Sequence, residues 1–293
     1  MSHACSLFIH RLTVLRWVYI IEGIFSVLVA VLVWFGLPTD PSNAYFLNDH
    51  DKHLMQIRAH QRAAYMGSEE FSWEEVKNAF RDPKVYLSAA IQFLQDILLY
   101  GFSTFLPSII QSFHKTSLQT QYLTIPVYLV AAAAFMALAF FSDRFLIRSP
   151  FLLFANMFGI VGYVLLLVDV SNAVKFFGCF LCSIAVYTGP GLNIAWLNVN
   201  MAPQYRRATA IGVQQSIANT AGIVAGQIYR KSPYVLGNGF SLGAICLSQV
   251  IIIIKYFYIR RCNEEKRRIA IGQKEDTRKV TSGDQAVDFM YHL

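Results

Sequence analysis

Charged residues are scarce in this chain. Only 15% of its 293 residues are Asp, Glu, Lys or Arg, whereas soluble domains carry about 25% charged residues. Hydrophobic residues make up 55% of the sequence, and the mean hydropathy is +0.41. This composition argues against an ordinary soluble domain and directs attention to the hydrophobic stretches.

The sequence also lacks the motifs of common catalytic sites. It has no His-Glu-x-x-His zinc motif, no nucleophile elbow and no glycine loop that would cradle a phosphate. Cys179 and Cys182 lie in an apolar stretch, where packed thiols are a better explanation than a metal or redox pair. We therefore expect no enzymatic activity, no cofactor and no bound metal.

Seven hydrophobic stretches dominate what is present. They cover residues 17–37, 85–113, 122–141, 151–168, 176–200, 208–228 and 239–259. A hydrocarbon core about 30 Å thick is crossed by about 20 helical residues, so each stretch is long enough to span a bilayer. The third to the sixth contain no charged residue. The sequence therefore predicts an all-α polytopic membrane protein with the lipid bilayer as its surroundings.

The stretches divide the chain into five expected parts. These are an extracellular or luminal stub (1–16), a membrane helix (17–37), an amphipathic loop (38–84), a six-helix bundle (85–259) and a polar tail (260–293). In the loop, Ser72 and Glu75 form a capping-box pattern, and Asp82-Pro83 should stop the helix that they begin. The tail lacks apolar periodicity, so we expect it to be mobile.

The net charge of +7 comes from basic residues at stretch ends. The connections after the third and fifth stretches and the tail share one side and carry an excess of Lys and Arg, which predicts a cytoplasmic tail. The N-terminus then lies on the other side. A basic charge placed in this way indicates contact with membrane surfaces and no nucleic-acid partner.

Several polar residues within the stretches are candidates for a transport pathway. Gln92, Asp96, Tyr100 and Ser103 recur at helical spacing and share one face. An ionisable residue inside a membrane helix usually faces a cavity or a partner, so Asp96 either carries a proton or is neutral and hydrogen-bonded to a neighbouring helix.

Two further stretches contribute amides and a ring. Asn193 and Trp196 could present polar groups to an organic substrate, whereas Asn198 and Asn200 lie near the stretch end, where hydration explains them. The amides of Gln214, Gln215 and Asn219 fit substrate binding and contact between helices equally well. We expect no cation in mid-membrane to meet an anionic substrate.

Glycine and proline interrupt two stretches. Gly101 and Pro107 lie in the second, and the run Gly189-Pro190-Gly191 lies in the fifth. These residues weaken the helical hydrogen-bond pattern and let backbones approach closely, so they predict bends at a moving gate or in a merely structural helix.

Five motifs, in the same order as in a known family, resemble fungal major facilitator transporters of the anion:cation symporter family, which includes allantoate and nicotinate permeases. The motifs are RWVYIIEG (16–23), FSWEEVKNAFRDPK (71–84), YGFSTFLPSII (100–110), SDRFLIR (142–148) and RRATAIGVQQSIANTAGI (206–223). The resemblance covers about residues 11–260. It implies the major facilitator fold, truncated to the sixth to twelfth of twelve helices.

The family resemblance also implies a function. It implies proton-coupled uptake of a small organic anion or vitamin-like carboxylate, such as nicotinate or allantoate, across the plasma membrane. Asp143, Arg144 and Arg148 resemble the superfamily's loop motif, although Ala139 replaces a usual glycine. By this resemblance Asp143 pairs with Arg144 or Arg148 at a cytoplasmic gate; the alternative is an ordinary basic anchor. The cation for the anionic substrate should lie in the missing N-terminal bundle.

Two other interpretations stay open at this level. A seven-helix receptor would also have seven spans and Asp143-Arg144 at the inner end of the third, but the long loop after the first span fits it poorly. The second alternative is that the chain is an inactive fragment of a transporter. Uptake into vesicles distinguishes a transporter from both, because neither a receptor nor a fragment accumulates its ligand.

Overall fold

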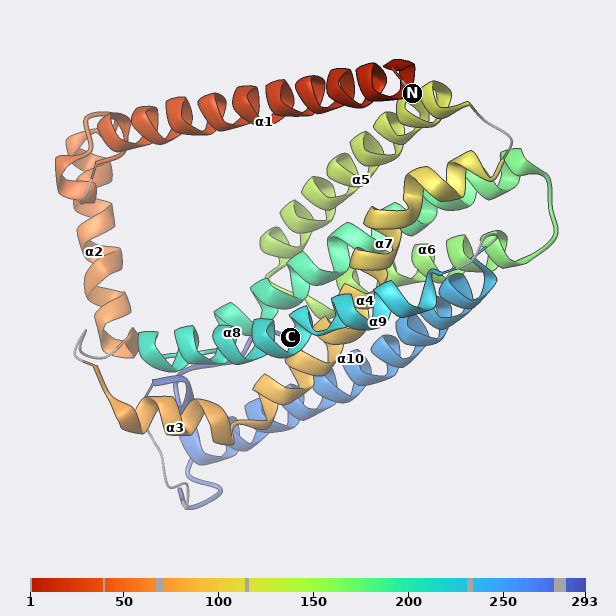
Figure 1. The fold of residues 1–293 in the computed structure, drawn as a ribbon. Coiled ribbons are helices and arrows are strands. Elements are labelled where there is room, and N and C mark those ends of the chain that lie inside the picture. The colour runs from red at the N-terminus through yellow and green to blue at the C-terminus, as the bar shows by residue number, and fades with distance from the viewer. Residues whose placement is uncertain (1, 39, 67–70, 114–115, 231–233, 277–282) are drawn as a thin grey trace. The chain divides into compact units, whose positions relative to one another are not determined.

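The computed structural model describes residues 2–38, 40–66, 71–113, 116–230, 234–276 and 283–293. Within these residues the secondary structure is helical, with ten α-helices and two short 3₁₀ helices (Figure 1). This agrees with the all-α prediction. The chain forms two compact units, Met1–Ala63 and Ala64–Leu293, and each is described by itself.

The first unit begins with a long helix. This helix, α1 (Ser2–Gly36), is followed by η1 (Pro41–Asn43) and by α2 (Asp49–Met66), which runs across the unit boundary. The window Tyr19–Gly36 of α1 is apolar and long enough to cross a membrane. The predicted stub is continuous with this helix, because α1 already begins at Ser2, and its place outside the membrane stays a prediction. No proline or glycine precedes Gly23 that would stop the helix.

The second unit contains the other long apolar helices. They are α4 (Pro83–Gln111), α5 (Ser117–Phe145), α6 (Ser149–Leu167), α7 (Asn172–Val199) and α10 (Val235–Ala270). With α1, they make six helices in the described chain that are long and apolar enough to span a membrane. Six of the seven predicted stretches therefore correspond to such helices, and the protein is an integral, multi-pass membrane protein.

The predicted span 208–228 is not one helix. It is divided between α8 (Gln204–Asn219) and α9 (Ala221–Ile228), which meet at Thr220. The Thr220 hydroxyl donates to the Ile217 carbonyl at 2.6 Å, and the Asn219 amide donates to the Gln215 carbonyl at 2.8 Å. Such local side-chain bonds compete with the helical pattern and favour a break. The prediction of a continuous span is wrong at this point.

Helix α4 lies at the centre of the second unit. It packs against α5, α7, α8, α9 and α10, and α6 packs against α7 and α10. A methyl group added at Gly101 would come within 2.5 Å of the Tyr229 ring, and one added at Gly189 within 2.9 Å of the Gln95 side chain. Helices α4 and α7 continue through Gly101, Pro107 and Gly189–Gly191. These glycines allow close packing without interrupting either helix.

The helix expected before the second stretch is α3 (Trp73–Arg81). Its N-cap is Ser72, whose hydroxyl accepts from the Glu75 N–H at 3.5 Å, and the helix ends before Asp82. Both features were predicted. Asp82 in turn caps α4, because its carboxylate accepts from the Lys84 N–H at 2.9 Å. The helix α3 packs against α8.

The described parts of the tail, residues 260–276 and 283–293, are more ordered than the expectation of a mobile segment, and residues 277–282 lie outside the described residues. Helix α10 continues to Ala270, and residues 283–293, which we call the strap, pack against helices of the same unit. Asp284 is fully buried, and only 5% of the Tyr291 surface is exposed. The strap contacts the end of the bundle at which α4 begins and α7 ends. We call this end of the bundle the tail side. Side chains from neighbouring helices satisfy its backbone, so no periodic apolar pattern is needed.

Candidate functional site

A buried set of polar side chains joins four helices of the second unit. We call it the polar cluster. It consists of Ser88, Gln92 and Asp96 of α4, Asn193 of α7, Gln214 of α8 and Lys255 of α10. The three α4 residues are spaced four apart and therefore lie on one face of the helix. Burying polar groups in an apolar bundle is costly unless they pair, so the cluster is a candidate site.

Gln92 is the centre of the polar cluster. Its Nε2 donates to the Asp96 carboxylate at 3.1 Å, while its Oε1 accepts from Asn193 Nδ2 at 2.8 Å and from Gln214 Nε2 at 3.4 Å. Four predicted pathway residues are thus brought together. Asp96 is 4% exposed, and the bond from Gln92 holds one of its oxygens. This geometry fits both predicted roles for Asp96, as a proton carrier and as a hydrogen-bonded neutral group.

Two members of the polar cluster, Ser88 and Lys255, were not predicted from the sequence. Lys255 is 1% exposed, and its ammonium lies 2.7 Å from Ser88 Oγ, 3.5 Å from Asn193 Oδ1 and 3.8 Å from the centre of the Trp196 ring. Among the described residues, no carboxylate forms an ion pair with it. Lys255 is thus a buried base four residues before the end of the stretch 239–259, and the expectation of no cation in mid-membrane stays a prediction. The signals were present, since Ser88 precedes Gln92 by one turn and Lys255 is a base inside a hydrophobic stretch.

The remaining predicted pathway residues lie outside this network of bonds. The Tyr100 hydroxyl donates to Asn219 Oδ1 at 2.6 Å, and the Ser103 and Tyr187 hydroxyls are 2.8 Å apart. Trp196 connects to the cluster through the Lys255 ammonium alone. Gln215 is partly exposed on α8. The predicted α4 face is therefore divided between the polar cluster and two separate pairs.

The predicted gating motif lies at the connection between α5 and α6. Arg148 forms an ion pair with Asp143, and its guanidinium also donates to Ser142 Oγ at 3.3 Å. The predicted pairing is thus made by Arg148, while Arg144 lies exposed in the last turn of α5. Leu146 has a left-handed backbone with φ of 57° and caps α5, so the chain turns sharply before Arg148.

A second set of buried ions lies on the tail side. This charge cluster consists of Asp82, Lys84, Arg206 and Asp284, each 4% exposed or less. Asp82 pairs with Lys84 at 3.3 Å and with Arg206 at 2.8 Å, and Asp284 pairs with the same two bases at 2.5 and 2.7 Å. Two acids and two bases compensate each other, which is the condition for burying charge.

Tyr291 covers one side of the charge cluster. Its hydroxyl donates to Asp284 Oδ2 at 3.2 Å, and the Lys84 ammonium lies 3.9 Å from the centre of its ring. Burial, and after it the charge of Asp284, raises the pKa of the Tyr291 phenol well above its usual value. The phenol therefore stays a hydrogen-bond donor at physiological pH.

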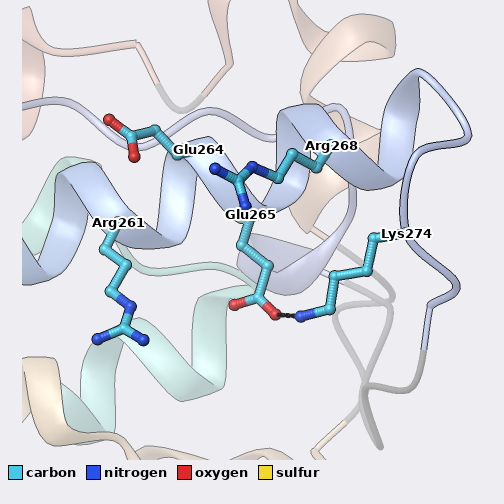
Figure 2. A pocket seen from close by; sticks show the side chains of 5 residues that line it. All are labelled: Arg261, Glu264, Glu265, Arg268 and Lys274. Atoms are coloured by element: carbon cyan, nitrogen blue, oxygen red, sulfur yellow. Dashed lines mark hydrogen bonds and ion pairs between the residues drawn. The ribbon is translucent and has the colours of Figure 1, made fainter.

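The two described cavities lie apart from the polar cluster. One, of about 220 Å³, is lined by Arg261, Glu264, Glu265, Arg268 and Lys274 (Figure 2). In it Glu265 forms an ion pair with Lys274. The other, of about 300 Å³, is lined mainly by apolar side chains near the ends of α4 and α7, including Phe113 and Phe176. In the described part of the chain, no group of three His, Cys, Asp or Glu side chains is placed to hold a metal.

Comparison with known proteins supports a membrane transport family. The model of the Major Facilitator Superfamily matches residues 4–226. An uncharacterized transporter of Schizosaccharomyces pombe is 45% identical over 278 residues, which is 94% of this chain and 58% of that protein. A second uncharacterized transporter of the same yeast is 46% identical and is covered over 56% of its length.

One relative has a named substrate. The high-affinity nicotinic acid transporter of Saccharomyces cerevisiae is 30% identical over 271 residues, which is 92% of this chain and 51% of that protein. The chain thus spans between 51% and 58% of the length of these three relatives.

Proposed function

Because the chain belongs to the major facilitator superfamily, we propose that it forms the C-terminal part of a secondary transporter. In this proposal it holds the last helix of the N-terminal bundle and the whole C-terminal bundle, and a partner bundle completes the translocation path. Transporters of this type rock two bundles around a site near the middle of the membrane. The transported molecule is a small organic anion, taken up together with protons.

The observation that carries this proposal is the polar cluster. Polar side chains also hydrogen-bond between purely structural membrane helices, but this cluster joins four helices and contains both an acid and a base. Ionisable residues within a membrane are costly and are typical of substrate and proton pathways. The cluster therefore supports a transport role better than a structural one.

Asp96 is our candidate for the proton carrier. It is the one acid of the polar cluster, and Gln92 bonds to only one of its carboxylate oxygens. A carboxyl buried in an apolar bundle binds a proton more readily than one in water, because burial disfavours its charged form. Release of that proton on one side of the membrane would give the cycle its direction.

The proposed substrate class is a small carboxylate such as nicotinate. The named yeast relative supports it, and so does the buried amine of Lys255, which donates hydrogen bonds that a carboxylate oxygen could accept. The amides of Gln92, Asn193 and Gln214 offer hydrogen bonds to a ring nitrogen or a carboxylate. Tyr100, Ser103, Trp196, Gln215 and Asn219 are further candidates for the path.

We further propose that the tail side is cytoplasmic and that the protein works in the plasma membrane. The connection that holds Asp143 and Arg148 would then face the cytoplasm, where their ion pair stabilises one state of the gate. The excess of Lys and Arg on the tail side is the supporting observation.

Uptake of radiolabelled nicotinate tests the proposal. The chain is expressed in yeast cells alone and together with the preceding half of the 45% identical relative, and uptake is measured with and without a protonophore. We expect accumulation that the protonophore abolishes. Binding without accumulation in both arrangements would contradict transport and favour a receptor. Accumulation that survives the protonophore would contradict proton coupling alone.

A further inference from the structure

The strap is bound through its backbone by two asparagine side chains. The Asn263 amide accepts from the Tyr291 N–H and donates to the Tyr291 carbonyl, both at 2.9 Å. The Asn200 amide does the same for His292, at 2.7 and 2.8 Å. Each of these two adjacent residues thus has its N–H and its carbonyl bonded to one side chain, and the two asparagines come from different parts of the bundle.

The first part of the strap is held by charge. Asp284 pairs with Lys84 and Arg206, its N–H donates to the Ala202 carbonyl at 3.1 Å, and its own carbonyl accepts from Lys266 at 2.5 Å. Asp284 is fully buried, so these bonds are made away from water and are stronger than surface pairs.

The last residues of the strap reach the two regions that we connect with transport. The His292 carbonyl accepts from Trp196 Nε1 at 2.9 Å, and the same indole ring faces the Lys255 ammonium of the polar cluster. The Leu293 carbonyl accepts from the Arg148 N–H at 2.5 Å and from the Ser149 N–H at 3.4 Å. The strap therefore connects the charge cluster, the polar cluster and the connection between α5 and α6.

We propose that the strap is a positioning element that holds the connection between α5 and α6, and with it the Asp143–Arg148 ion pair, in place against the ends of α7 and α10. The position of this connection follows from the strap, because the Arg148 and Ser149 N–H groups at the start of α6 have no helical partner and bond to Leu293 instead. The tail of this chain is thus a fixed part of the bundle. This inference rests on contacts alone and does not depend on the substrate or on proton coupling.

Hydrogen–deuterium exchange followed by mass spectrometry tests the inference on the purified full chain. The backbone N–H groups of Asp284, Tyr291 and His292 are hydrogen-bonded, so we expect a peptide covering 283–293 to exchange at least about 10-fold more slowly than an unstructured peptide. Exchange of the whole peptide at the unstructured rate would overturn the proposal.

Two variants separate positioning from mere attachment. In the Asn200→Ala/Asn263→Ala double variant, we expect faster exchange both in the strap and in a peptide covering 142–150. Asn198→Ala is the matched control, because Asn198 is exposed in the last turn of α7, two residues before Asn200, and it should change neither peptide. A strap that is released while peptide 142–150 keeps its wild-type rate would overturn the positioning role.

Deletion of residues 283–293 gives an independent readout. We expect the midpoint of thermal unfolding to fall by about 5 °C or more, since removal of Asp284 leaves Lys84 and Arg206 with one carboxylate in place of two. If the deletion variant does not fold, Asp284→Asn is compared with Glu275→Gln, a substitution at an exposed acidic position of the tail. Equal midpoints for these two variants would contradict the role of Asp284 in anchoring the strap.

Discussion

Replacing Lys255 should cost little stability, although its side chain is buried and well bonded. The ammonium has a hydrogen bond to Ser88, a longer one to Asn193 and a contact with the Trp196 ring. A hydrogen bond to a charged group contributes about 1.5–3 kcal/mol, and a desolvated cation–π contact about 2 kcal/mol. Together they roughly offset the several kcal/mol that burying one ion costs. Lys255→Met removes the contacts and the cost together.

Removing Ser88, the nearest hydrogen-bond partner of Lys255, should lower the stability more than replacing Lys255 itself. Ser88→Ala leaves the ammonium buried without its shortest hydrogen bond, which we expect to lower the free energy of unfolding by about 1–3 kcal/mol. For a protein of this size, that is a fall of about 2–10 °C in the unfolding midpoint. In a Lys255→Met background the same Ser88→Ala change should cost much less, since no charge remains to be stabilised.

The assay is thermal unfolding of the purified protein in detergent, measured for wild type, both single variants and the double variant. We expect the Lys255→Met midpoint to stay within about 5 °C of wild type, the Ser88→Ala midpoint to be the lower of the two, and the double variant to recover. The reasoning is refuted if Lys255→Met is the more destabilising single change, or if the two effects are additive. Exposed Lys77→Met is the control for loss of one charge.

Three further predictions concern other positions. Asp96→Asn should keep the unfolding midpoint near that of wild type but lower nicotinate uptake at least about 10-fold, since the amide cannot release a proton; unchanged uptake would exclude Asp96 as the carrier. Gly101→Ala should cost about 1–3 kcal/mol because its methyl group meets the Tyr229 ring, while Gly212→Ala, with open space around it, should be neutral or gain about 0.5–1 kcal/mol in thermal unfolding. Burial raises the pKa of the Glu75 carboxyl. The contribution of this carboxyl to stability is therefore fully present below its ordinary pKa and is lost as the pH rises through the raised pKa. Glu75→Gln should make the unfolding midpoint depend less on pH between pH 4 and pH 7, and an unchanged pH dependence would contradict this.

The membrane helices were predictable because hydropathy and length are strong local signals. The stretch 85–113 corresponds to α4, and 151–168 corresponds to α6, each within a few residues. The shared face of Gln92 and Asp96 on α4 also followed from helical spacing alone. In the structure, Asn193 of α7 and Gln214 of α8 contact this face through Gln92. Polar residues in an apolar helix are few, so their spacing carries most of the information.

The features that were missed depend on individual side-chain bonds, some local and some between distant segments. Thr220 divides a hydrophobic stretch through a hydroxyl bond that hydropathy does not register. Lys255 looks like a base that could reach the membrane surface, and only the packing of α10 against α4 turns it inward.

The strap was missed for a related reason. The asparagines that bind it, Asn200 and Asn263, are 63 residues apart in the sequence and recognise its main chain. A polar segment of this kind has the composition of a mobile tail, because the bonds that order it come from side chains elsewhere.

The burial of the charge cluster has a consequence for how the protein responds to ionic strength. Dissolved ions screen attractions between solvent-exposed charges over a length of about 10 Å at 0.1 M salt and about 3 Å at 1 M, whereas charges enclosed by protein are screened much less. An outer pair such as Arg260 with Glu264 should dissociate in concentrated salt. The contacts of Asp82 and Asp284 with Lys84 and Arg206 should persist. The charge cluster should therefore stay intact at salt concentrations that break ion pairs on the surface.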